Sequence, residues 1–173
     1  MMSTAPTFTV LFDSTGDLFN NEFIDAEGRV IYKLATLHTQ PNVTQLERTK
    51  ERLALHPSEP WRAVMQFGNG GELGHLYLGE RPATPMATYL KRKSGLPGRS
   101  RFFVAVDGNE YQWRPGSRRI ECYDKNDRLI ALYEWLLDGP SHARLEIKIG
   151  GWHILSEIMT TLLLNRYAIR HEV

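Results

Sequence analysis

Residues 150–167, GGWHILSEIMTTLLLNRY, form the most apolar segment of the chain and constrain its fold more than any other feature. The apolar residues recur in an i, i+1, i+4, i+5 rhythm, which predicts a helix. This helix would be apolar almost all round, as is typical of a buried helix. A membrane span needs about 20 predominantly apolar residues, whereas this run is shorter and contains Glu157 and Arg166. We therefore predict a central core helix over residues 152–168 and no transmembrane segment.

Most of the chain before this helix predicts β-strands, because short segments alternate between apolar and polar residues. Asp107-Gly108 is a strong hairpin signal, so we expect a tight turn there with Gly108 at positive φ. The predicted strands cover residues 8–12, 23–25, 29–36, 62–67, 73–78, 102–106, 110–114, 119–123, 129–137 and 145–149.

Two segments between the strands carry helix signals. Residues 43–55 fit either a strand, which we favour, or a helix opened by Thr44 and Glu47 as a capping box. Thr84-Pro85 is typical of a helix start and predicts a short crossover helix between the two halves of the chain.

These elements predict a mainly β (α+β) fold in a single domain. An antiparallel sheet can remove its edges by closing into a barrel, and a barrel of about 10–12 strands can hold one helix in its lumen. We expect such a closed barrel around the buried C-terminal helix. Its first half covers about residues 8–78, its crossover 79–100 and its second half 101–149.

Several segments resemble an uncharacterised domain family of mushroom-forming fungi. They are DAEGRVIYKLAT, YLKRK, SRFFVAVDGNEYQWR, CYDKNDRLIALYEW and ILSEIMTTLLLNRY. That family is similar to the tubby C-terminal, LURP-one and phospholipid scramblase barrels. The resemblance implies a barrel of about twelve strands around a hydrophobic helix, and a phosphoinositide-type ligand bound by basic side chains. The cysteine cluster and calcium site of scramblases have no counterpart in this sequence.

Composition limits the classes of function. The chain of 173 residues has a formal net charge of +1, which argues against a globally basic nucleic-acid binder but not against a local basic patch. Cys122 is the only cysteine, so no disulfide forms within the chain. The first residues lack the pattern of a secretory signal. We expect an intracellular, cytoplasmic protein. A location at the periphery of membranes and a nuclear location are the alternatives.

One basic segment is the candidate binding site. KRKSGLPGRSR, residues 91–101, holds five cations and no acid, and three arginines follow in the next hairpins. Lys and Arg clusters bind phosphate through point charge and bidentate contacts. The alternative is a solvated crossover loop or a nuclear-import-like patch. The candidate phosphate-binding residues are Lys91, Arg92, Lys93, Arg99, Arg101, Arg114, Arg118 and Arg119.

Other residue types predict structural roles. The six histidines show no metal-binding spacing, so no metal or other cofactor is expected. We assign Cys122 and the four tryptophans to the core, His153 to capping or packing, and Asp13 and Asp17 to turns rather than to a catalytic carboxylate pair.

The leading hypothesis is a non-catalytic binding module. Because the helix would fill the lumen, the ligand should bind on loops or outer faces. It would be an anionic lipid headgroup, a phosphate or a protein partner. The alternative is an enzyme with a cleft at the barrel rim, for which two convergent groups of displaced pKa would be evidence. A third alternative is a self-assembling or regulatory protein.

Overall fold

A computed structural model describes residues 8–49, 61–95 and 98–173 of the chain. Two helices, α1 (Met86–Tyr89) and α2 (Leu155–His171), and two 3-10 turns, η1 (Asn69–Gly71) and η2 (Ile149–Ile154), accompany one large sheet. Its strands are β1 (Phe8–Asp13), β2 (Asn21–Ile24), β3 (Val30–Leu37), β4 (Gln40–Arg48), β5 (Arg62–Gln66), β6 (His75–Leu78), β7 (Thr84–Pro85), β8 (Arg101–Val104), β9 (Glu110–Pro115), β10 (Arg119–Tyr123), β11 (Leu129–Trp135) and β12 (Ala143–Lys148).

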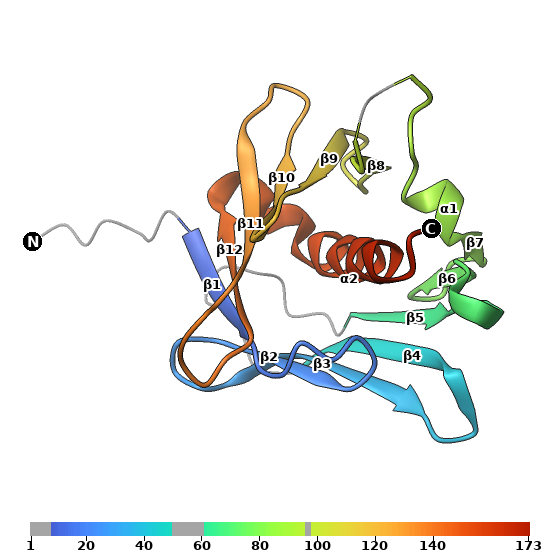
Figure 1. Cartoon of the computed structure of the whole chain (residues 1–173), viewed down its shortest axis with the longest axis horizontal. Coiled ribbons are helices and arrows are strands. Elements are labelled where there is room, and N and C mark those ends of the chain that lie inside the picture. The colour runs from blue at the N-terminus through green and yellow to red at the C-terminus, as the bar shows by residue number, and fades with distance from the viewer. Residues whose placement is uncertain (1–7, 50–60, 96–97) are drawn as a thin grey trace, which may run out of the picture.

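The helix α2 lies in the hollow of the curved sheet, with β9–β12 on one side and β3–β5 on the other (Figure 1). The prediction of a buried C-terminal helix is confirmed, since Ile158 and Leu162 are fully buried. The hydroxyl groups of the buried threonines on this helix donate hydrogen bonds to backbone carbonyls one turn earlier. Thr161 donates to the Glu157 carbonyl over 2.7 Å and accepts the Trp113 indole N–H over 2.8 Å.

Gly151 allows the chain to enter this helix from β12. A Cβ atom there would lie 2.8 Å from Ile158 Cδ1 and 3.1 Å from the Ile130 carbonyl oxygen, closer than side-chain carbons normally approach. A larger residue would therefore require the Ile158 side chain to move and the Ile130 backbone to shift slightly.

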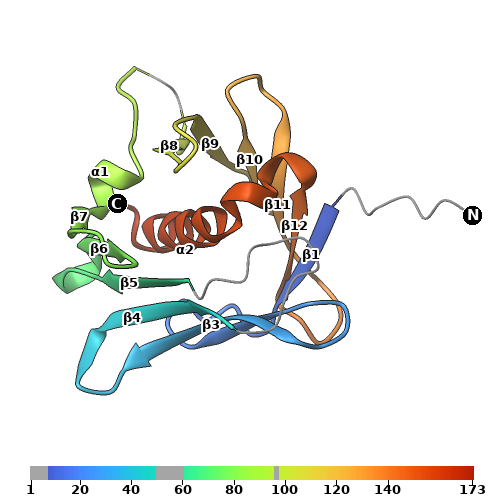
Figure 2. The same ribbon diagram turned by 180° about the vertical axis from the view of Figure 1, so that it is seen from behind.

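The sheet is open, so the predicted closed barrel is wrong. Its strands are all antiparallel to their neighbours in the order β7-β6-β5-β4-β3-β2-β1-β12-β11-β10-β9-β8, and β7 does not pair with β8. The reason is local to the crossover. The strand β7 has only two residues and ends at Pro85, which has no N–H to donate to a further strand. The chain then turns into α1, and Lys91 instead makes an isolated bridge to Phe102 of β8. Seen from behind, β1 and β12 join the two halves of the sheet (Figure 2).

The elements expected from local patterns are present. The crossover helix occurs as α1, and the ambiguous segment is a strand as far as Arg48; residues 50–55 lie outside the described residues. The strands β8 and β9 form the expected hairpin, with Gly108 at a φ of 78°. Its connection runs over residues 105–109, because Ala105 still accepts the Gly108 N–H and donates to the Asn109 carbonyl.

Asp13 anchors the side of α2 to the sheet. Its buried carboxylate accepts bonds from Arg166 Nη1 over 2.9 Å, from the Tyr133 hydroxyl over 2.7 Å and from the Asn21 amide over 2.7 Å. It also accepts the Gly16 N–H over 2.7 Å, so the predicted turn role is confirmed. A buried ion pair with these additional bonds fixes the helix at one position against β1 and β11.

Candidate functional site

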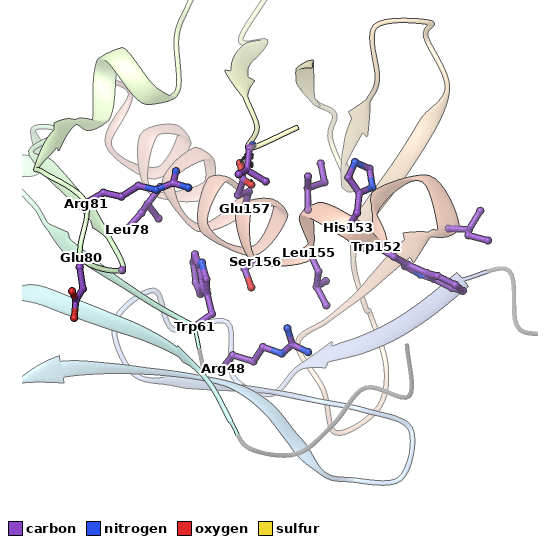
Figure 3. Close-up of a pocket in the computed structure, with 14 residues that line it drawn as sticks. Arg48, Trp61, Leu78, Glu80, Arg81, Trp152, His153, Leu155, Ser156 and Glu157 are labelled. Atoms are coloured by element: carbon purple, nitrogen blue, oxygen red, sulfur yellow. Dashed lines mark hydrogen bonds between the residues drawn. The ribbon is translucent and has the colours of Figure 1, made fainter. Parts of the chain in front are cut away.

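A pocket with a volume of about 680 Å³ lies at the start of α2. We call it the N-end pocket. Its walls come from the ends of β4 and β6, the turn after β6, the β8–β9 turn, and η2 with the first turn of α2 (Figure 3). A volume of about 300–1,000 Å³ is usual for ligand sites. Its described lining residues are Arg48, Trp61, Leu78, Gly79, Glu80, Arg81, Val106, Ile149, Trp152, His153, Ile154, Leu155, Ser156 and Glu157.

Aromatic and aliphatic side chains make up much of this pocket. Trp61 lies between Arg81 and Arg48, and Trp152 lies on the far side of Leu155 (Figure 3). At the rim, Val106 is 62% exposed and Ile149 is 63% exposed. The two come from separate elements, so the pocket has an apolar edge as well as apolar walls.

Two arginines supply positive charge. Arg48 ends β4, and its N–H donates to the Trp61 carbonyl over 2.8 Å, which fixes the two side by side. Arg81 follows a turn in which its N–H donates to the Leu78 carbonyl over 3.0 Å. Neither guanidinium forms a salt bridge with a described residue.

Glu157 supplies negative charge at the opposite wall, and Arg81 points toward it (Figure 3). Both of its carboxylate oxygens accept the Val106 N–H over 3.0 Å. Burial raises the pKa of Glu157, and the nearby Asp107 raises it further. The buried Tyr89 hydroxyl has no hydrogen-bond partner among the described residues. Burial, together with the charge of Glu157, raises the pKa of Tyr89.

Asp107 is hydrogen-bonded to His153, and its pKa is shifted in the direction opposite to that of Glu157. Its Oδ2 atom accepts the Tyr111 hydroxyl over 2.5 Å and lies 2.7 Å from His153 Nε2. Burial alone would raise the pKa of Asp107, but hydrogen bonds from Tyr111, His153 and Asn109 outweigh it and hold the pKa well below its ordinary value. This carboxylate therefore stays ionised beside Glu157.

The β8–β9 turn uses its aspartate differently from the β2–β3 and β10–β11 turns, which have a similar hydrogen-bond pattern. In the others, Asp25 pairs with Arg29 and Asp124 pairs with Arg128, four residues on, so each carboxylate is used within its own turn. Ala105 stands at the equivalent place before β9, and Asp107 directs its carboxylate out of the turn to η2. The turn beside the pocket is thus linked to the start of α2.

The predicted cationic residues do not form one surface group. Arg101 is only 5% exposed, and its guanidinium donates to the carbonyls of Leu90 and Val173, so it does not lie on an outer face, where the ligand was expected to bind. Arg92 and Arg99 are exposed and line a pocket of about 220 Å³ with Arg101, Glu172 and Val173 at the end of α2. Lys91 and Lys93 are exposed, and Lys93 pairs with Glu110.

The remaining three arginines line a separate pocket at the β9–β10 turn. Arg114 pairs with Asp127, and Arg119 pairs with Glu121 over 2.6 Å. Arg118 is exposed and makes no salt bridge with a described residue. No described residue lines both this pocket and the one at the end of α2.

The other candidates have mixed outcomes. Cys122 is fully buried, as predicted, and burial raises the pKa of its thiol. Trp113 is a core residue, but Trp61 and Trp152 also line the N-end pocket. His153 was expected to cap or pack, and its ring instead bonds Asp107. Among the described residues no cluster of His, Cys, Asp or Glu could hold a metal ion.

Residues 16–170 match DUF6593, a family of unknown function. The chain belongs to the DUF6593 family. The matched range includes the described lining of the N-end pocket and all of the predicted cationic residues. No curated protein and no solved structure matches the chain significantly. In the described part of this DUF6593 chain, no helix has the length and apolar character needed to cross a membrane.

Proposed function

We propose that this DUF6593 chain is a non-catalytic binding module and that its N-end pocket holds an anionic amphiphile, such as a lipid with a phosphate headgroup. The observation that carries the proposal is the combination in one pocket of Arg48 and Arg81, both without salt bridges to described residues, with apolar walls. Guanidinium groups suit phosphate because they donate several hydrogen bonds in a fixed plane. Tryptophan suits the boundary between a headgroup and an acyl chain.

The exposed rim supports a ligand that is presented by a membrane. Exposed Val106 and Ile149 flank the pocket mouth, and exposed aliphatic residues beside cations favour contact with an anionic bilayer surface. The domain would then be a peripheral protein on the cytoplasmic face of a membrane. A distant relation to tubby-type domains belongs to the same proposal, since both types place a C-terminal hydrophobic helix against about twelve strands.

Vesicle binding tests this function. The protein should bind phosphatidylcholine vesicles that contain phosphatidylglycerol, bind pure phosphatidylcholine vesicles much less, and bind less at high salt. The double variant Arg48→Gln/Arg81→Gln should lose roughly thirtyfold in affinity, since each cation near an anionic surface contributes about 1 kcal/mol. Monomeric dihexanoyl phosphatidylglycerol and inorganic phosphate distinguish a lipid site from a free-phosphate site.

A matched control uses cations outside the pocket. Lys33 on β3 and Arg62 on β5 are exposed and make no salt bridges with described residues. The variant Lys33→Gln/Arg62→Gln has the same change in net charge and should keep most of the affinity. Equal losses in the two double variants would show that binding depends on net charge alone, and would refute the pocket as the site.

A second site and a second function each have one observation in their favour. Lys91, Arg92 and Arg99 are exposed without salt bridges to described residues, so the predicted basic segment remains a proposed phosphate-binding surface.

The opposite pKa shifts of Glu157 and Asp107 favour an enzyme, because acid–base catalysis uses such pairs. Hydrolysis of ester or phosphoester probes, lost in Glu157→Gln, would support the enzyme over the binding module.

A further inference from the structure

We infer that the N-end pocket takes up its anion together with a proton, which binds to Glu157. This inference rests on the proposed function, because it assumes an anionic ligand held by Arg48 and Arg81. It adds a rule for that site: the affinity for the anion rises as the pH falls. It also assigns Glu157 a role in the selection of the ligand.

Charged and titratable groups face Glu157 from each element around it. Asp107 follows β8, His153 lies in η2 and Tyr89 in α1, while Arg81 follows β6. The hydrogen bond from the Val106 N–H favours the ionised form of Glu157 most, followed by the charges of Arg81 and His153. An anion bound to Arg81 would offset that positive charge and add a like charge next to the carboxylate.

The proton should go to Glu157 rather than to Asp107. Asp107 accepts bonds from Tyr111, His153 and Asn109, all of which favour its ionised form. Glu157 is partly buried, and the Val106 N–H donates to its carboxylate, with the Tyr89 hydroxyl beside it. Once protonated, Glu157 no longer repels the ligand and can donate its O–H to an anionic oxygen.

The direction of the pH dependence follows from reciprocity between the two binding events. If the anion raises the pKa of Glu157, then protonation of Glu157 raises the affinity for the anion by the same factor. The affinity is low above the pKa of the complex, rises as pH falls toward the pKa of the free protein, and is constant below it. Each unit between those two pKa values gives about a tenfold change in affinity.

Calorimetry with dihexanoyl phosphatidylglycerol tests the inference, because its phosphodiester keeps one negative charge over the whole range. Titrations of the full chain in two buffers of different ionisation enthalpy, at several values between about pH 4.5 and pH 8, report the protons taken up. Between the pKa of Glu157 in the free protein and its pKa in the complex, the parent should take up a fraction of a proton when it binds the lipid. Its binding should be tighter at the acid end of this pH range. Glu157→Gln should bind as tightly at neutral pH as the parent does in acid, with a flatter pH profile.

Glu72→Gln is the matched control, since Glu72 is exposed, makes no salt bridge with a described residue and does not line the pocket. This variant should keep the proton uptake and pH profile of the parent. If Glu157→Gln misfolds, the carboxyl ¹³C shift of Glu157 in the parent gives the same answer, and its titration should move to higher pH when the lipid is bound.

The outcomes separate the inference from the proposed function. Lipid binding that depends on Arg48 and Arg81 but not on pH would overturn the inference and leave the binding function in place. Proton uptake that persists in Glu157→Gln would also overturn it, because another group would carry the proton. No lipid binding at any pH would overturn both.

Discussion

At the start of α2, Arg48 and Arg81 face an amphipathic pocket with apolar walls, whereas the pocket at its end is smaller and is lined mainly by polar residues, Arg92, Arg99, Arg101 and Glu172 among them. Arg101 is buried on two backbone carbonyls. Arg92 and Arg99 share their pocket with Glu172. A helix is also negative at its C-terminal end, so cations there stabilise the helix before they bind any ligand. Arginine count alone therefore does not locate an anion site.

The largest expected effect concerns an arginine with a purely structural role in the C-terminal half of α2. Arg166→Leu leaves the Asp13 carboxylate buried without its counter-charge, and breaking such a pair costs about 3–5 kcal/mol. Urea denaturation followed by circular dichroism should show this loss. A loss near zero would mean that the helix is not fixed by this pair.

Arg101→Gln should give the next largest effect. The change removes donors from the carbonyls of Leu90 and Val173 in a buried place, and unsatisfied buried groups cost about 1–3 kcal/mol each. The free energy of unfolding should fall while the affinity for phosphatidylglycerol vesicles stays that of the parent. An Arg101 variant of normal stability and weakened lipid binding would reverse the comparison between the two ends.

The sequence predicts local elements of this structure better than contacts between distant segments. The helix α2 and the hairpins were predictable because their signals are local, such as apolar spacing and the Asp107-Gly108 turn. Closure of the sheet was not, because it depends on whether β7 meets β8 across the crossover, and only Pro85 hints that it does not.

The N-end pocket was less predictable than the fold. It brings together Arg48, Arg81, Val106 and Glu157 from separate elements, and no motif of fixed spacing connects them. The basic segment attracted attention because its cations are contiguous in sequence. Arg101 shows the limit of that signal, since it begins β8, whose first three residues are all buried.

Glu157→Gln should change the stability less than Arg166→Leu or Arg101→Gln does, and it should stabilise the protein rather than destabilise it. Because burial raises the pKa of Glu157, the folded state holds this proton more tightly than the unfolded state does. The stability of the parent should therefore decrease as pH rises through the window from the unfolded pKa to the folded pKa. Glutamine carries no such penalty, so the melting temperature of the variant should exceed that of the parent at neutral pH.

The pH profile of the melting temperature checks this prediction. The difference between Glu157→Gln and the parent should shrink in acid, where the parent's carboxyl is protonated in both states. Glu72→Gln should match the parent throughout, as an exposed acid that does not line the pocket. A Glu157→Gln variant less stable than the parent at neutral pH would show that the Val106 N–H bond outweighs burial.

The smallest effect on stability should come from Lys91→Gln, Arg92→Gln and Lys93→Gln combined. All three side chains are exposed. The one salt bridge lost, Lys93 to Glu110, is a surface pair of the kind that contributes about 0–1 kcal/mol. The melting temperature should thus stay close to that of the parent, and any change in lipid affinity can be assigned to charge.

This triple variant also decides between the two ends of α2 as the binding site. If the basic segment contributes only long-range attraction, its loss should weaken vesicle binding less than Arg48→Gln/Arg81→Gln does, although it removes one more charge. The remaining affinity should still depend on salt, because Arg48 and Arg81 are intact. A greater loss than in the double variant, with a flattened salt dependence, would instead place the phosphate site on the basic segment.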